Sequence, residues 1–218
     1  MTTFLDRTDA GRRLADQLRH HRQEHPVVLG LPRGGVVVAD EVARALGAPL
    51  DVMVVRKIGA PGNPEFAVGA LAPGVTHIEE HTVQILNVPR EYLRHAVARE
   101  QGELRRREAL YRAGRPAVEF GGRTVILVDD GLATGATATA AIAAVRARGA
   151  HRIVLAVPVG ASDTIAKLRN LVDDLVCLDT PPLFRAVGQA YVEFSPVTDE
   201  EVQDILRGRC VEYGEAVV

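Results

Sequence analysis

Val125-Ile126-Leu127-Val128-Asp129-Asp130-Gly131-Leu132-Ala133-Thr134-Gly135-Ala136-Thr137 is the segment that says most about the architecture of this chain. Its first four residues are branched, apolar and without alternation, which is typical of a strand buried on both faces of a parallel sheet. The Ala-rich residues 138–148 predict a helix. We therefore expect residues 129–137 to connect the carboxyl end of a strand to the amino end of a helix.

Such a junction binds anions, because free backbone amides and the positive end of the helix dipole converge there. Gly135 allows close approach of the backbone, and the hydroxyls of Thr134 and Thr137 add donors. Asp129 and Asp130 would repel a phosphate and instead suit the vicinal hydroxyls of a ribose. The pattern indicates a sugar-phosphate site, although two Asp residues here could also simply end a strand and cap a helix.

Other nucleotide motifs do not fit this segment. A Walker A loop needs a Lys that the segment lacks, and no G-x-G-x-x-G dinucleotide fingerprint is present. Two hydrophobic residues, an acidic pair and T-G-x-T instead resemble the phosphoribosyl pyrophosphate (PRPP) signature of type I phosphoribosyltransferases. The resemblance implies that Asp129 and Asp130 are catalytic and that the following residues bind substrate, namely Gly131, Leu132, Ala133, Thr134, Gly135, Ala136 and Thr137.

A second loop lies where this family needs one. Residues 30–35 (GLPRGG) follow the strand predicted at 26–29 and precede the helix predicted at 36–46. In the family, the equivalent Arg-Gly turn receives the departing diphosphate through backbone amides, often with a non-proline cis peptide. The resemblance thus assigns a catalytic role to Arg33 and substrate binding to Gly34 and Gly35. A Gly-rich turn whose Arg faces solvent is the equally open alternative.

A third loop is expected at residues 56–64 (RKIGAPGNP), after the strand predicted at 51–55. Its two Gly, two Pro and one Asn predict a mobile loop, which resembles the family's catalytic lid. Lys57 is the first choice for a catalytic diphosphate contact, and Arg56 for substrate binding. Both could instead be ordinary exposed charges. Glu65 could act as a general acid or be a solvated carboxylate.

The three loops are most similar to those of adenine phosphoribosyltransferases, which share R-K-x-G followed by P-G. Gly131 departs from the large aliphatic residue usual after the second acid. Ala133 replaces the Asp that 6-oxopurine enzymes use to handle a ring proton, so guanine and hypoxanthine are disfavoured as acceptors.

The rest of the chain predicts one domain over residues 1–218, because 218 residues at 47% hydrophobic suffice for one core. Its fold class is α/β, with a doubly wound, mainly parallel sheet and flanking helices. In the first half of the chain we expect a helix over Thr8–Leu18 capped by Thr8, and a hairpin or edge strands over 68–78. A long inserted helix is expected at about 89–113. Strands are expected at 152–159 and 175–178, with a helix capped by Ser162 or Asp163 between them, and a C-terminal hood over 179–218.

The hood segment concentrates aromatic residues after Pro181-Pro182. Phe184 or Tyr191 could stack on an acceptor base, or both could pack the tail against the core. Cys177 and Cys210 are expected to be reduced, and His21 and His25 are interpreted as a helix end rather than as zinc ligands.

Composition argues against several classes of partner. A net charge of -2 gives no global reason to bind nucleic acid or an anionic membrane, and no run approaches the roughly 18 apolar residues of a membrane span. We expect a cytoplasmic protein without an export leader. A homodimer is an expectation by analogy with the family.

The implied reaction moves the 5-phosphoribosyl group of PRPP to a nitrogen acceptor, a nucleobase other than a 6-oxopurine, with release of pyrophosphate. This would make the protein a pentosyltransferase of nucleotide salvage. Mg²⁺ would arrive with the substrate, with Asp129 and Asp130 as its nearest protein ligands. The alternatives are a non-catalytic PRPP-sensing regulator or binding module on the same fold, and a phosphoribosyl hydrolase.

Overall fold

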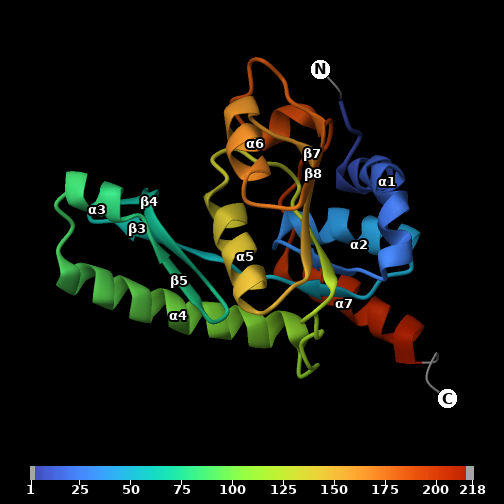
Figure 1. Cartoon of the computed structure of the whole chain (residues 1–218), viewed down its shortest axis with the longest axis horizontal. Coiled ribbons are helices and arrows are strands. Elements are labelled where there is room, and N and C mark those ends of the chain that lie inside the picture. The colour runs from blue at the N-terminus through green and yellow to red at the C-terminus, as the bar shows by residue number, and fades with distance from the viewer. Residues whose placement is uncertain (1–2, 215–218) are drawn as a thin grey trace.

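A computed structural model describes residues 3–214 and contains a five-stranded parallel sheet with helices on both faces (Figure 1). The strand order is β2-β1-β6-β7-β8. This confirms the predicted α/β class and places the carboxyl ends of all five strands at one edge. The strands are β1 (Val27–Gly30), β2 (Leu50–Val52), β6 (Thr124–Val128), β7 (Arg152–Val159) and β8 (Asp174–Asp179).

Each central strand contributes to two cores, because successive residues point to opposite faces of the sheet. Val28, Ile126 and Val154 are in register and belong to one core. Their neighbours at 27, 125 and 153 belong to the other. Helices α1 (Arg7–Leu18) and α2 (Gly34–Leu46) cover the first face, and α5 (Ala136–Ala147) and α6 (Ser162–Arg169) cover the second.

The first and sixth helices begin differently from prediction. Helix α1 is capped by Asp6, whose carboxylate accepts from the amide of Asp9, so the prediction of Thr8 as the cap is wrong. Thr8 lies inside the first turn, and Asp6 supplies the side-chain acceptor that the free amides need. Ala161 holds the cap position of α6, so neither Ser162 nor Asp163 is its cap.

Residues 56–64 form ordered β structure, so the prediction of a mobile loop there is wrong. Strands β3 (Arg56–Ala60), β4 (Asn63–Ala72) and β5 (Val75–Ile78) build a separate antiparallel sheet. The turn needs only Pro61 and Gly62, and Ile58 is fully buried, so the apolar residues of the segment pack in a sheet. The hairpin of β4 and β5 confirms the prediction for 68–78.

The long charged helix is confirmed as α4 (Arg90–Arg112), with Pro89 at its cap position. It packs along the antiparallel sheet, and Tyr92 donates a hydrogen bond to the carbonyl of Gly59 at 2.9 Å. The short helix α3 (Glu80–Ile85), which the sequence did not predict, leads into it. Together these elements extend the molecule away from the parallel sheet (Figure 1).

A 3₁₀ helix, η1 (Arg19–Glu24), ends at His25 in a left-handed conformation, which confirms that the histidines mark a helix end. Glu24 accepts hydrogen bonds from His21 and from the hydroxyl of Thr124, the first residue of β6. Burial raises the pKa of Glu24, but these hydrogen bonds oppose it and leave that pKa below its usual value. The network joins η1 to the amino end of the central strand.

The C-terminal segment returns to the start of the chain. Phe4 pairs with Tyr191, with hydrogen bonds from Phe4 N to Ala190 O (2.8 Å) and from Val192 N to Phe4 O (2.9 Å). Helix η2 (Val187–Ala190) precedes this pairing, and α7 (Asp199–Gly214) follows it and packs on α4 and α2. Tyr191 is buried between Phe4 and Phe194, so it packs the tail and does not stack on a base.

Cys177 is a free thiol whose pKa burial raises to about 11, and the side chain of Cys210 lies outside the described residues. Within residues 3–214, none of the helices combines the length and the apolar character needed to cross a bilayer.

Candidate functional site

The loops that follow β1 and β6 touch each other, because these two strands are neighbours in the parallel sheet. A Cβ atom built on Gly34 would lie 1.9 Å from Oδ2 of Asp130, and one on Gly35 would lie 2.8 Å from Cα of Asp129. Leu31 N also donates to Val128 O at 2.8 Å. Both glycines are therefore needed so that the Arg-Gly turn can approach the acidic pair.

The Arg-Gly turn contains a non-proline cis peptide, as the resemblance implied. The cis peptide joins Pro32 to Arg33, ahead of the Arg33–Gly34 pair. The Arg33 side chain is exposed. Among residues 3–214, the amides of Arg33, Gly34 and Gly35 donate to no protein acceptor. These three amides are thus available to an anion at the carboxyl end of β1.

The acidic pair is held in a network of short bonds. Asp129 Oδ1 accepts from Asp130 N at 2.9 Å, and the Tyr191 hydroxyl donates to Asp130 O at 2.6 Å. Burial and the charge of Asp130 raise the pKa of Asp129 well above its usual value. Burial, followed by the same charge, also raises the pKa of Tyr191. The two carboxyl groups thus repel each other at this site.

Arg7 is a site residue that sequence reasoning missed. Its Nε donates to Asp130 Oδ2 at 2.8 Å, with both side chains largely buried, and its Nη1 donates to Ser195 O at 2.8 Å. The guanidinium also lies 3.9 Å from the ring centroid of Phe194. No local pattern reveals Arg7, because its partners lie more than a hundred positions away along the chain.

The loop before α5 is built as an anion cradle. Gly135 is the cap residue and has a φ of 75°, the left-handed region that favours glycine. Thr134 is exposed and Thr137 is half-buried. In the described part of the chain, the amides of residues 133–137 donate to no protein group. The amides at the amino end of this 12-residue helix therefore face outward without partners.

Leu132 and Ala133 fix this cradle to the neighbouring strand. Leu132 is buried, its amide donates to Val159 O, and its carbonyl accepts from Ala161 N, both at 2.9 Å. The Thr164 hydroxyl donates to the carbonyl of Ala133 at 2.7 Å. Leu132 therefore acts through its backbone as a support of the loop.

Gly131 departs from the family pattern for a reason that the structure supplies. A Cβ on Gly131 would lie 2.5 Å from Cγ1 of Val187 in η2. The hood segment thus occupies the volume that a large aliphatic side chain at position 131 would need.

The structure does not bring the two basic residues of β3 to the acidic pair. Arg56 donates from Nε and Nη2 to Oε2 of Glu100 in α4, at 3.0 and 2.9 Å. Lys57 is exposed and, with Arg56 and Tyr92, lines a cavity of about 500 Å³ to which residues 33–35 and 129–137 contribute nothing. Glu65 lies in β4, but its side chain is outside the described residues.

The donor set at the acidic pair fits a hard cation. Two mutually repelling carboxyl groups offer oxygen ligands, which Mg²⁺ prefers, and substrate phosphates commonly complete its coordination. Asp129 and Asp130 are the residues that would hold Mg²⁺ together with a diphosphate.

Comparison with known proteins gives a consistent result. The family model of the phosphoribosyl transferase domain matches residues 2–194. Two curated relatives, from two strains of Mycobacterium tuberculosis, are named "Putative phosphoribosyl transferase" and are each 46% identical over 217 residues. These cover 99% of this chain and 49% of each relative, so the chain spans about half of their length.

Among solved structures, TT1426 from Thermus thermophilus is 48% identical, with a TM-score of 0.82. The alignment covers 94% of this chain and 98% of TT1426. The architecture described above is thus shared with an experimental structure along almost the whole chain.

Proposed function

Because this chain belongs to the phosphoribosyl transferase family, we propose that it transfers the 5-phosphoribosyl group of PRPP to a nitrogen acceptor and releases pyrophosphate. The observation that supports this most directly is the contact of Gly34 and Gly35 with Asp129 and Asp130. It brings two sets of free amides and a pair of acids to neighbouring strand ends, which is what a sugar carrying phosphates at both ends requires.

The 5'-phosphate would bind at residues 133–137. The amides there are without protein acceptors within residues 3–214, and the dipole of α5 adds positive potential. Thr134 and Thr137 would add hydroxyl donors. The hydroxyl of Thr139 is not available for this role, because it donates to Gly135 O at 3.0 Å.

Asp129 and Asp130 would hold the ribose hydroxyls, and the amides of residues 33–35 would receive the diphosphate. Bound Mg²⁺ would neutralise charge on the diphosphate. In the reaction the bond between C1 and the diphosphate oxygen breaks, a bond between C1 and the acceptor nitrogen forms, and configuration at C1 inverts. The protein contributes mainly positioning and electrostatic stabilisation of the oxocarbenium-like transition state.

Lys57 and Arg56 would complete the site from the β3–β4 hairpin. The exposed side chain of Lys57 would contact the diphosphate when the hairpin closes, and Arg56 would exchange Glu100 for the substrate. The methyl group of Ala133 supplies no acid or base for a 6-oxopurine, so we propose another nucleobase as the acceptor. Such a reaction belongs to nucleotide salvage in the cytoplasm.

The test is to incubate the chain with PRPP, Mg²⁺ and a panel of bases, and to measure pyrophosphate and nucleotide products. Asp129→Asn should reduce turnover by about a hundredfold, since misplacing the reacting carbon has that effect. Thr139→Ala is the matched control and should turn over like the wild type. If the chain binds PRPP tightly but releases no pyrophosphate with any of the bases, the transferase proposal is wrong and the chain is a PRPP-sensing module.

A further inference from the structure

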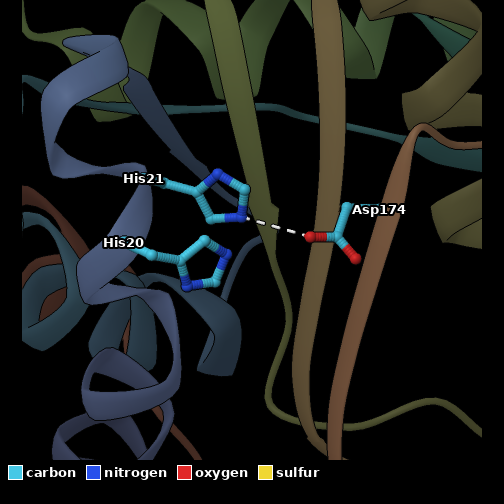
Figure 2. A group of neighbouring side chains, drawn as sticks. All are labelled: His20, His21 and Asp174. Atoms are coloured by element: carbon cyan, nitrogen blue, oxygen red, sulfur yellow. Dashed lines mark hydrogen bonds and ion pairs between the residues drawn. The ribbon is translucent and has the colours of Figure 1, made fainter.

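Two adjacent histidines and a distant aspartate meet at the edge of the sheet opposite the acidic pair. His20 and His21 lie in η1, and Asp174 is the first residue of β8. Since all five strands are parallel, the start of β8 lies at the other edge from residues 129–137. Potential ligand atoms of His20, His21 and Asp174 all lie within 4.8 Å of one another, and both rings project toward Asp174 (Figure 2).

His21 is unusual because both of its ring nitrogens face carboxylates. The ring is only 1% exposed, with Nδ1 2.8 Å from Glu24 Oε1 and Nε2 3.2 Å from Asp174 Oδ2. An ionised carboxylate only accepts hydrogen bonds, and a neutral imidazole carries one N–H. One lone pair of the ring therefore faces a carboxylate oxygen unless a second proton or a metal ion lies between them.

We propose that His20, His21 and Asp174 bind a divalent transition-metal ion such as Zn²⁺. Imidazole nitrogen and carboxylate oxygen are ligands that Zn²⁺ accepts. Glu24 supplies the outer contact that zinc-binding histidines commonly have, an acceptor for the second ring nitrogen that fixes the tautomer. Glu24 is itself held by the Thr124 hydroxyl at 2.9 Å, so the His21 ring is oriented from two elements.

The distances suit this assignment. With metal–ligand bonds of about 2.1 Å, neighbouring ligand atoms of a tetrahedral site lie roughly 3.4 Å apart. The 3.2 Å between His21 Nε2 and Asp174 Oδ2 is close to that value. His20 is exposed, and within residues 3–214 its ring makes no hydrogen bond, so it can rotate to become the third ligand. Water would take the fourth position.

The ion would have a structural role. It would tie η1 to the first residue of β8, two segments that lie 153 positions apart along the chain at His21 and Asp174. The competing arrangement is a doubly protonated His21 that bridges Glu24 and Asp174 without metal. His20 is a ligand only in the arrangement with a metal ion, so substitution of His20 distinguishes the two arrangements.

The experiment uses the full chain after treatment with a chelator, titrated with Zn²⁺ and with Co²⁺ in the absence of PRPP. We expect one ion per chain, visible absorption of four-coordinate Co²⁺, and an unfolding midpoint that rises with Zn²⁺ concentration, because the ion binds the folded state. Failure to bind one ion per chain would overturn the proposal and leave His21 as a hydrogen-bonded bridge between Glu24 and Asp174.

Two partly exposed ligands give variants that should fold. His20→Ala and Asp174→Asn should each weaken Zn²⁺ binding at least tenfold. Loss of a residue that only hydrogen-bonds a metal ligand already costs about tenfold, and loss of a ligand should cost more. His95→Ala, an exposed position on α4, and Asp129→Asn, at the acidic pair, should bind Zn²⁺ like the wild type. Unchanged affinity in His20→Ala would overturn the site. His20→Ala should retain full pyrophosphate release, so loss of metal binding and loss of transferase activity are measured separately.

Discussion

Arg7 donates a hydrogen bond from Nε to Oδ2 of Asp130 across 123 positions of the chain, with only 11% and 16% of the two side chains exposed. The same guanidinium lies over Phe194 and donates to Ser195 O. The N-terminal helix and the C-terminal hood are thus both attached to the second acid of the proposed ribose site.

Arg7→Ala should destabilise the fold by about 3 kcal/mol, because it leaves Asp130 largely buried and unpaired. It should also lower turnover by misplacing that carboxylate. Arg19→Ala is the matched control, since Arg19 pairs with Asp16 at the end of the same helix with both side chains mostly exposed, and its loss should cost about 0.5 kcal/mol at most. Urea unfolding of both variants checks the prediction, and equal losses of stability would contradict it.

Gly34→Ala should abolish activity, because the added Cβ would lie 1.9 Å from Asp130 Oδ2 and 2.6 Å from Arg7 Nε. Gly102→Ala in α4 meets no atom within 4 Å and should raise stability by about 0.5–1 kcal/mol through helix propensity. Pyrophosphate release and thermal unfolding distinguish the two substitutions. A fully active Gly34→Ala protein would mean that the two loops do not need to touch.

Gly131→Ala should destabilise the protein by about 1–3 kcal/mol, since its Cβ would overlap Val187 Cγ1 at 2.5 Å. Adding Val187→Ala should recover part of that loss by removing the overlapping methyl groups. The double-mutant cycle therefore predicts a favourable coupling energy between positions 131 and 187. Additive effects in denaturant unfolding would show that the hood does not fill the space at position 131.

Lys57→Ala and Arg56→Ala should differ in stability, although both residues belong to the proposed site. Lys57 is exposed, so its loss should reduce transferase turnover with little change in stability. Arg56 donates two hydrogen bonds to Oε2 of largely buried Glu100, which keeps Arg99 as a second partner, so Arg56→Ala should lower the unfolding free energy by about 2 kcal/mol. Both variants should lose turnover and only Arg56→Ala should also lose stability, so measuring turnover and urea unfolding of both variants checks the prediction.

Tyr111 should stay protonated to unusually high pH. Burial, and then its hydrogen bond to Asp199 at 2.7 Å, raise its pKa from 10.0 to about 12. The folded state favours the neutral phenol, so this stabilisation is complete below pH 10 and is lost as pH rises through 12. Tyr111→Phe should cost about 1.5 kcal/mol at neutral pH. In a pH titration followed by phenolate absorbance, the step near pH 12 should be missing from that variant.

The parallel sheet and the loop between β6 and α5 could be predicted because their signals are local. Val125 to Val128 form an unbroken apolar run, and Gly135 stands where a helix must begin. The sequence does not predict the hairpin at 56–64, because its Gly and Pro residues are typical of loops and two of each occur in nine residues. Only Pro61 and Gly62 turn the chain, while Ile58 is fully buried in the small sheet. Burial of that kind depends on α4, which lies farther along the sequence.

Long-range contacts account for the rest of what the sequence did not reveal. Arg7 reads as one basic residue among several in a first turn, and Asp174 as an ordinary strand end. Their roles arise from partners more than a hundred positions away, at Asp130 and His21. Neither periodicity nor spacing carries such information, because each contact is created by the strand order of the sheet.

The pairing of Phe4 with Tyr191 and of Arg7 with Ser195 also sets an order of events during protein synthesis. The ribosome reaches Ser195 188 residues after Arg7. A nascent polypeptide can therefore form β1, α2 and β6 while Arg7, the partner of Asp130, still lacks its contacts with Phe194 and Ser195. Asp130, the proposed ribose contact, acquires its final surroundings only after the hood has been translated, so a chain that stops before the hood would lack part of the site proposed for PRPP.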